Sequence, residues 1–198
     1  NYVNMFRDPQ WLDSARVTLT YVFLSVPLKL GFALLVALML KQGLRALGIY
    51  RAIYYVPSLL GGSVAIALLW QQIFSENGIF NQALGLIGIH STTSWISTPN
   101  TALSTLVILS VWQFGSPMLI FLAGLKQIPP EYYEAASTDG AGIFRKFFSI
   151  TLPMITPILF FNLILQIVGA FQAFTPAYIV SGGTGGPVDA TLFYTLYV

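Results

Sequence analysis

Residues 131–153 read EYYEAASTDGAGIFRKFFSITLP, a long polar stretch in a chain that is otherwise mostly apolar. Two prolines precede it, and proline suits the first turn of a helix because the N–H that it lacks would be unpaired there. The acidic side chains at the start of the stretch are favoured near a helix N-terminus. Gly140 can adopt the left-handed conformation that ends a helix. The stretch therefore predicts two short helices joined at Gly140, the second running towards Pro153, which form a compact knob between apolar segments.

The rest of the chain has the composition of a membrane protein. Of its 198 residues, 56% are hydrophobic and 8% are charged, whereas about 25% are charged in soluble domains. The net charge of +2 is too small to suggest a nucleic-acid partner. There is no cysteine, and His90 is the single histidine. We therefore expect no catalytic thiolate, no disulfide and no metal site built from cysteine or histidine.

Four apolar intervals are long enough to cross about 30 Å of hydrocarbon. The predicted fold class is therefore an all-α integral membrane protein, a polytopic helix bundle. In the second interval Pro57 implies a bend. Because the chain begins at Asn1 instead of Met and opens a further span near its end, we expect it to be a fragment of a longer protein. The predicted spans are 17–40, 52–75, 101–125 and 152–177, with the start of another at 191.

The basic residues indicate how these spans are oriented. Linkers 41–51 and 126–146 hold six of the nine Lys and Arg residues, whereas the loop 76–100 and the glycine-rich turn 181–189 hold none. Cytoplasmic loops carry an excess of Lys and Arg. We therefore expect both basic linkers, and with them Glu134, to lie in the cytoplasm, and the loop and the turn to lie outside.

The residue spacing in the opening stretch matches a known motif. Glu134-Ala135-Ala136 is followed by three residues, Gly140, nine residues and then the sequence ITLP. This pattern resembles the EAA loop of the permease subunits of ABC importers, and its DGA variant resembles that of the carbohydrate branch. The alternative is an ordinary amphipathic connector, which predicts no fixed spacing.

The resemblance implies a fold and a set of partners. It implies one permease domain of the type I ABC importer fold over 1–198, with a cytoplasmic coupling-helix pair in the region 126–150 that fits a groove of an ATPase dimer. That ATPase would bind ATP and Mg, so we expect no cofactor and no enzymatic activity in this chain. An external solute-binding protein would deliver a sugar, and the expected location is the inner (cytoplasmic) membrane of a prokaryote, in contact with lipid. The residues carried over for ATPase coupling are Glu134, Ala135, Ala136, Asp139, Gly140 and Arg145.

A second segment points to one type of permease within that branch. Residues 171–174 read FQAF and are followed by YIVSGGTGGP at 178–187 and by Thr191. This resembles a segment typical of permeases related to the larger permease of the maltose importer, and it implies a heterodimer with a second permease. A phosphate-binding loop is the alternative interpretation of the glycines, but no Lys-Ser or Lys-Thr follows them.

Polar and aromatic residues inside the predicted spans are candidates for a substrate pathway, because polar groups in a bilayer usually face a bundle interior or a wet cavity. Neutral amides with aromatic rings suit a sugar or polyol better than a phosphate or carboxylate, which would call for paired bases. The alternative for each amide is an interhelical hydrogen bond that only fixes packing. The candidates are Trp112, Gln113, Gly115, Ser116, Asn162, Gln166, Gln172 and Phe174.

Lys29 stands near the centre of the first predicted span. In one interpretation Lys29 is a counter-ion for the substrate or a partner in a gate. In the other, its long stem carries the ammonium to water or to an internal partner. A secondary transporter or channel is the alternative function, but such proteins normally need acidic groups or helix breaks around an ion site, and the predicted spans hold no Asp or Glu. A membrane enzyme is a third possibility for which no nucleophile and base can be assembled.

Overall fold

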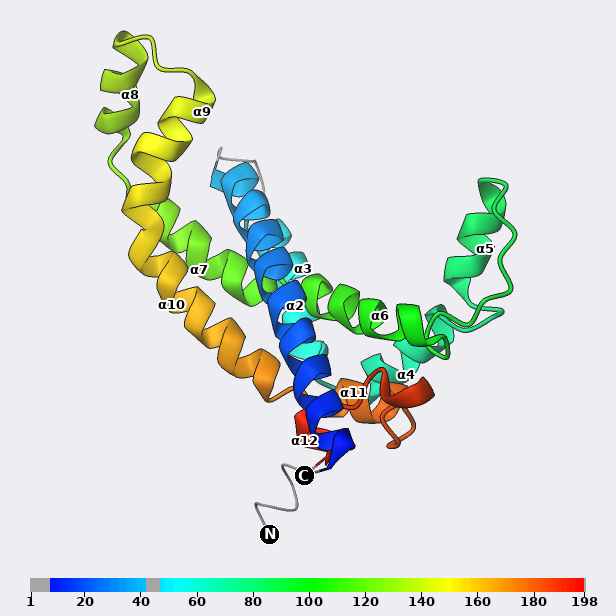
Figure 1. The fold of residues 1–198 in the computed structure, drawn as a ribbon. Helices are drawn as coiled ribbons and strands as arrows, with labels where there is room; N and C mark the ends of the chain where they lie inside the picture. The colour runs from blue at the N-terminus through cyan, green and yellow to red at the C-terminus, as the bar shows by residue number, and fades with distance from the viewer. Residues whose placement is uncertain (1–7, 42–46, 198) are drawn as a thin grey trace.

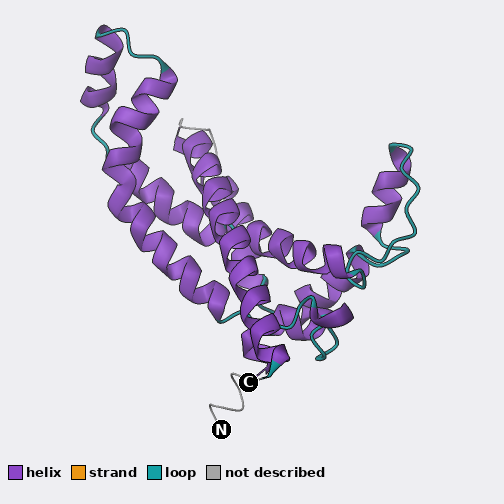
Figure 2. Cartoon of the chain, in the orientation of Figure 1, coloured by secondary structure: helices purple, strands orange, loops and turns teal. Residues whose placement is uncertain are grey.

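The structure is a computed structural model that describes residues 8–41 and 47–197. Within these ranges every regular element is a helix (Figure 2). The expected all-α fold is therefore confirmed. Residues 1–7 and, in the basic linker after the first span, residues 42–46 with Arg45 lie outside the described residues.

The chain folds into a series of helices that Figure 1 labels in order. Their bounds are α2 Pro9–Lys41, α3 Leu47–Leu60, α4 Val64–Ile73, α5 Ile79–Leu86, α6 Pro99–Trp112, α7 Gly115–Lys126, α8 Pro130–Thr138, α9 Ile143–Lys146, the π-helical segment η1 Phe147–Thr151, α10 Leu152–Phe171, α11 Thr175–Val180, the 3₁₀ turn η2 Pro187–Asp189 and α12 Tyr194–Tyr197.

Helix α2 begins earlier than the predicted first span. The side chain of Asp8 accepts a hydrogen bond of 3.0 Å from the backbone N–H of Gln10, and Pro9 occupies the first helical position. Acceptors before a helix and proline at its start both stabilise its N-terminus. The helix therefore includes polar residues that precede the predicted span 17–40.

The interval 52–75, expected to be one span, is instead two helices. Helices α3 and α4 meet at 96° across a break at Gly61–Ser63. Pro57 lies within α3 and does not cause the break. The hydroxyl oxygen of Ser63 accepts a hydrogen bond of 3.3 Å from the N–H of Ile66 and caps α4, and the side-chain amide of Gln113 donates one of 3.2 Å to the Gly61 carbonyl at the break.

The third predicted span is also divided, into α6 and α7, which meet at 42°. The bend at Gln113 and Phe114 is held by Ser58 of α3. The Ser58 hydroxyl donates a hydrogen bond of 2.9 Å to the carbonyl of Gln113 and accepts one of 2.9 Å from the N–H of Ser116. One side chain thereby satisfies backbone groups that the bend releases.

Helix α9 continues through η1 into α10 without interruption, so the second helix of the knob is the first turn of a long helix. The expectation that it is a separate short helix is corrected. Pro153 therefore lies inside this continuous helix, two residues after the π-helical segment η1, where it cannot donate the regular helical hydrogen bond. Two helical stretches, Pro9–Lys41 and Ile143–Val180, are each long and apolar enough to cross a membrane, and the two bent pairs pass the same test when each is taken as one span.

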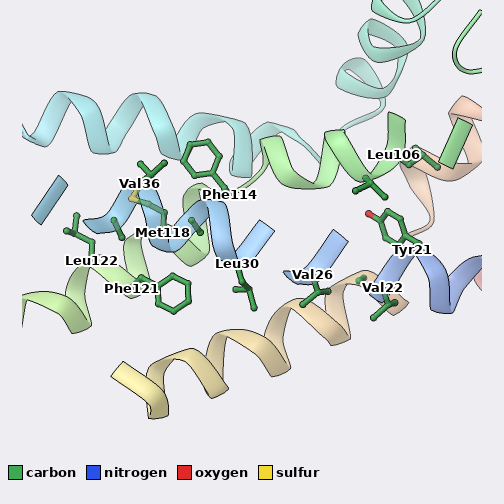
Figure 3. Close-up of a cluster of buried hydrophobic side chains, with 14 of the residues drawn as sticks. Tyr21, Val22, Val26, Leu30, Val36, Leu106, Phe114, Met118, Phe121 and Leu122 are labelled. Atoms are coloured by element: carbon green, nitrogen blue, oxygen red, sulfur yellow. The ribbon is translucent and has the colours of Figure 1, made fainter. Parts of the chain in front are cut away.

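Helix α2 lies in the middle of the bundle and packs against α6, α7, α10 and α12. In Figure 3 the side chains of Val26 and Leu30 point towards α10, and that of Tyr21 points towards Leu106 of α6. Phe121 of α7 is fully buried in the same core. The apolar side chains that face outward on α2 and α10 remain exposed, as expected for surfaces that meet lipid or another subunit.

Candidate functional site

The knob, defined as α8, α9 and the turn between them (residues 130–146), projects from one end of the molecule (Figure 1). Gly140 has a φ of 74° and ends α8. The N–H of Ala141 donates to the carbonyl of Ala136 at 2.8 Å, and that of Gly140 donates to the carbonyl of Ser137 at 3.1 Å. This pair of bonds is a Schellman motif, which requires a left-handed residue at the position of Gly140.

Side-chain contacts hold the two helices of the knob together. The ammonium of Lys146 donates a hydrogen bond of 2.7 Å to the hydroxyl of Ser137. The hydroxyls of Tyr133 and Thr151 lie 2.9 Å apart and share a hydrogen bond. Lys146 therefore holds α8 against α9, and Thr151 holds α8 against η1.

The knob has an exposed surface that is both acidic and apolar. Neither α8 nor α9 contains a buried residue. Ile143 is 85% exposed and Phe144 is 81% exposed. Of the residues predicted to couple to an ATPase, only Ala136 is half-buried, and the exposed ones are Glu134, Ala135, Asp139, Gly140 and Arg145.

A cavity of about 320 Å³ lies among α2, α6, α10 and α11. Four of the predicted pathway residues line it: Gln113, Gln166, Gln172 and Phe174. They come from three different parts of the chain, so the fold brings together residues that the sequence could only propose separately. The other lining residues are Tyr21, Val26, Lys29, Gly62, Leu106, Leu109, Ser110, Gly169, Ala170, Ala173, Thr175 and Pro176.

The other four predicted pathway residues are not in this lining. Asn162 is fully buried, and its side-chain amide donates a hydrogen bond of 3.3 Å to the carbonyl of Pro117. Gly115 lies so close to the backbone of Tyr54 that a Cβ would overlap its carbonyl. These two residues bring helices together.

Trp112 and Ser116 also have packing roles in the structure. The rings of Trp112 and Trp70 lie 6.0 Å apart between their centres. The N–H of Ser116 donates to Ser58 at the bend between α6 and α7. Four of the eight candidates therefore line the cavity, and the other four pack helices together.

Sequence reasoning did not select several polar residues in the lining, among them Tyr21, Ser110 and Thr175, and it left Lys29 open. The spacing of two of these residues in the sequence could have indicated that they line a cavity. Tyr21 and Lys29 are eight residues apart, so their side chains are about 80° apart around α2, within one broad stripe of the helix. A polar pair at that spacing in an apolar helix indicates the face that meets a cavity.

The segments expected outside the membrane are held by hydrogen bonds. The side-chain amide of Asn81 donates to the carbonyls of Glu76 and Thr93, each at 2.9 Å, and its oxygen accepts from the indole N–H of Trp95 at 2.7 Å. In the glycine-rich turn, the hydroxyl of Thr191 donates to the carbonyl of Gly185 at 2.7 Å.

Over 8–41 and 47–197, no group of three or more His, Cys, Asp or Glu residues is placed to hold a metal ion.

Apolar helices around a polar cavity, with an exposed helical knob at one end, are the features of a membrane transport subunit. The family described as "Binding-protein-dependent transport system inner membrane component" matches residues 4–197, and the chain belongs to this family. The membership expected from the EAA-like spacing is confirmed. The family name also confirms an inner-membrane transport component as the class of protein.

Curated relatives match essentially the whole chain. The chain is 53% identical over 199 residues to the probable ABC transporter permease protein YesP of Bacillus subtilis (strain 168), covering 100% of this chain and 64% of that protein. It is 36% identical over 198 residues to the trehalose/maltose transport system permease protein MalF of Thermococcus litoralis, covering 99% of this chain and 66% of that protein. The chain thus spans about two thirds of the length of these relatives.

A solved structure shares the fold. The crystal structure of a bacterial alginate ABC transporter in complex with an alginate pentasaccharide-bound periplasmic protein matches 96% of this chain and 65% of that chain, with a TM-score of 0.79 and 24% identity. The expected fold of an ABC importer permease is therefore confirmed.

Proposed function

We propose that the chain is the membrane-spanning subunit of an ATP-driven importer and forms part of the pathway for a sugar or related polyol. The knob, with the following residues to Pro153, couples it to a separate cytoplasmic ATPase dimer, which binds ATP and Mg and performs the hydrolysis. A second permease subunit completes the membrane part as a heterodimer. An external binding protein delivers the sugar.

The observation that carries this proposal is the surface of the knob. Glu131, Glu134 and Asp139 are exposed there, and charges of this density do not enter a bilayer. The knob therefore lies in water, yet Ile143 and Phe144 are almost fully exposed beside these charges. Exposed apolar side chains surrounded by polar ones mark a surface that binds another protein.

The shape of the knob supports a partner with a groove. Helix α8 stands away from the bundle (Figure 1), and Ala135, on its surface, allows close approach of another chain. The excess of Lys and Arg in the adjoining linkers supports a cytoplasmic position for the knob. A cytoplasmic ATPase is the partner that the family relationship favours.

The cavity supports a sugar as the transported molecule. The three glutamines in its lining, Gln113, Gln166 and Gln172, offer donors and acceptors for hydroxyl groups. Phe174 and Tyr21 offer ring faces for the apolar side of a pyranose. The name of the MalF relative, a trehalose/maltose permease, points to the same class of molecule.

Two segments are suited to meet the external binding protein. Helix α5 stands apart from the spans (Figure 1), and the Asn81 hydrogen bonds fix the loop behind it. Helix α11, which leads into the glycine-rich turn, is joined to α4 because the side-chain amide of Gln71 donates to the carbonyl of Ile179 at 2.9 Å. We propose that these two segments, 76–100 and 181–189, form the external contact.

The test is to purify the full-length protein gently from its native membrane and to identify the proteins that accompany it by mass spectrometry. Wild type is compared with Glu134→Lys, which reverses a charge on the knob. Glu76→Lys is the matched control, because Glu76 is also exposed but lies in the expected external loop. We expect an ABC ATPase and a second permease with wild type and with the control, and loss of the ATPase with Glu134→Lys.

Two outcomes would contradict the proposal. Purification of the protein alone in all three forms would favour a secondary transporter or channel that is not coupled to ATP. Retention of the ATPase by Glu134→Lys at wild-type stoichiometry would show that the ATPase does not bind through this part of the knob.

A further inference from the structure

Lys29 lies in the wall of the cavity, which Tyr21 of the same helix α2 also lines. The glutamines of α10 and of the bend after α6 line the same space. The side chain is half-buried, so its ammonium is removed from much of the surrounding water. The cavity is therefore not lined by neutral groups alone.

No carboxylate of these 198 residues lines the cavity with this cation. All seven acidic residues lie outside the cavity lining, and the only one on α2, Asp13, is sixteen residues away, about 24 Å along the helix. Within the part of the chain that the structure describes, Lys29 has no ion pair and no hydrogen bond to another residue. A cation within a membrane domain normally has a partner, so this one is open to a ligand.

The side chain of Lys29 cannot carry its ammonium to the water at either membrane surface. Twelve residues separate it from Lys41 at one end of α2, about 18 Å of helix, and the distance to Pro9 at the other end is longer. The four-carbon stem of lysine is too short to cover either distance. Its charge therefore acts within the cavity.

We propose that the cavity receives an acidic carbohydrate, one that carries a carboxylate, and that the Lys29 ammonium binds this carboxylate. The inference rests on the proposed function and narrows its substrate class. The paired bases expected from the sequence for an anionic substrate are not required, because one ammonium matches the single charge of a carboxylate, whereas a phosphate carries nearly two charges at neutral pH. The glutamines bind the hydroxyl groups, and Lys29 selects the acidic sugar over its neutral counterpart.

The test uses the whole transporter, with its partner subunits and binding protein, in liposomes. Uptake is measured for matched pairs of disaccharides: digalacturonate and galactobiose, cellobiouronate and cellobiose, and dimannuronate and mannobiose. We expect uptake of an acidic member, and a fall of about 10- to 100-fold in its initial rate with Lys29→Met, because a charge-assisted bond is lost. Lys29→Arg keeps the charge and should retain most of the rate.

The absence of cysteine from these 198 residues permits a sharper control for misfolding. In Lys29→Cys, a methanethiosulfonate reagent that attaches ethylammonium restores a positive charge to the already folded protein, and methyl methanethiosulfonate attaches a neutral group. We expect the first reagent to restore uptake of the acidic sugar and the second to leave it low. Wild type treated in the same way gives the background from other chains.

The outcomes separate the two proposals. Equal uptake of the acidic sugar by wild type and Lys29→Met, equal recovery with the charged and neutral reagents, or uptake of neutral sugars alone would overturn the role of Lys29 and leave the importer function standing. Failure of the intact complex to take up any of the sugars would count against the proposed sugar transport itself, and the inference would fall with it.

Discussion

The ammonium nitrogen of Lys41 lies 4.1 Å from the centre of the Tyr133 ring, so the last residue of α2 rests on the first helix of the knob. The hydroxyl of the same ring is hydrogen-bonded to Thr151, where η1 meets α10. Tyr133 therefore joins the knob to two long helices of the bundle. A displacement of α8 would therefore alter its contacts with both helices.

Replacing Tyr133 by Leu should loosen the knob without unfolding the bundle. The change removes a cation–π contact worth about 0.5–1 kcal/mol at an exposed site and a hydrogen bond worth about 1 kcal/mol. We expect amide hydrogen exchange in α8 to accelerate roughly 10-fold. Tyr132→Leu is the control, because Tyr132 is a neighbouring exposed tyrosine. Equal acceleration in the two variants would show that the ring contacts do not hold α8.

Replacing Gly140 by Ala should weaken ATPase binding. Gly140 has a φ of 74°, a conformation that costs a residue with a Cβ about 1–2 kcal/mol, so the turn between α8 and α9 shifts. We expect the dissociation constant of the purified ATPase to rise about 5- to 30-fold in a binding titration. Gly142→Ala is matched to it, because Gly142 has a φ of −70° and open space around a Cβ. A similar loss with both variants would contradict the conformational explanation.

The knob was largely predictable because its signals are local. A proline pair, acidic residues and a glycine within a few positions specify where α8 begins and ends. The breaks at Gly61–Ser63 and at Gln113 were not predictable in the same way. The second depends on Ser58, which meets the backbone of Gln113 from 55 positions away. Such a contact exists only after the helices have packed, so sequence reasoning expected continuous spans there.

Replacing Gly61 by Ala should destabilise the bend between α3 and α4. A Cβ at this position would overlap the side chain of Gln113, which donates a hydrogen bond of 3.2 Å to the Gly61 carbonyl. Displacing that side chain should cost about 1–3 kcal/mol, seen as a lower thermal unfolding midpoint of the purified protein. Gly62→Ala, with nothing within 4 Å of the added Cβ, should leave the midpoint unchanged. Equal midpoints for the two variants would refute the contact.

Replacing Asn162 by Leu and replacing Gln166 by Leu should have different effects on stability and on the rate of sugar uptake. Asn162 is fully buried, and its side-chain oxygen has no hydrogen-bond partner among the described residues. Asn162→Leu loses the hydrogen bond to Pro117 and adds volume at a fully buried site, so it should lower the free energy of unfolding by about 1–3 kcal/mol while the folded protein keeps its uptake. Gln166 lines the cavity, so Gln166→Leu should lower the rate of sugar uptake about 10-fold with little effect on stability. Loss of uptake by a stable Asn162→Leu protein would place Asn162 in the pathway instead.

This pair also shows why only part of the candidate site could be predicted. Asn162 and Gln166 are one helical turn apart, so they lie on nearly the same face of α10. What differs is the neighbour: Asn162 meets Pro117 of α7, whereas Gln166 faces the space beside α6 beyond the bend. The sequence indicates polar positions and their helical face. The bend that opens the cavity depends on tertiary contacts.

The unbroken run of α9, η1 and α10 has a mechanical consequence. It extends about 40 Å, from the exposed knob to the glutamines of the cavity. Near its middle, Ile158 fits against Gly124 and Asn162 bonds to Pro117, so α7 supports the helix between its two ends. The contact with α7 is the point about which this long helix would pivot. A rotation of the helix about this contact would move the knob and the cavity wall in opposite directions.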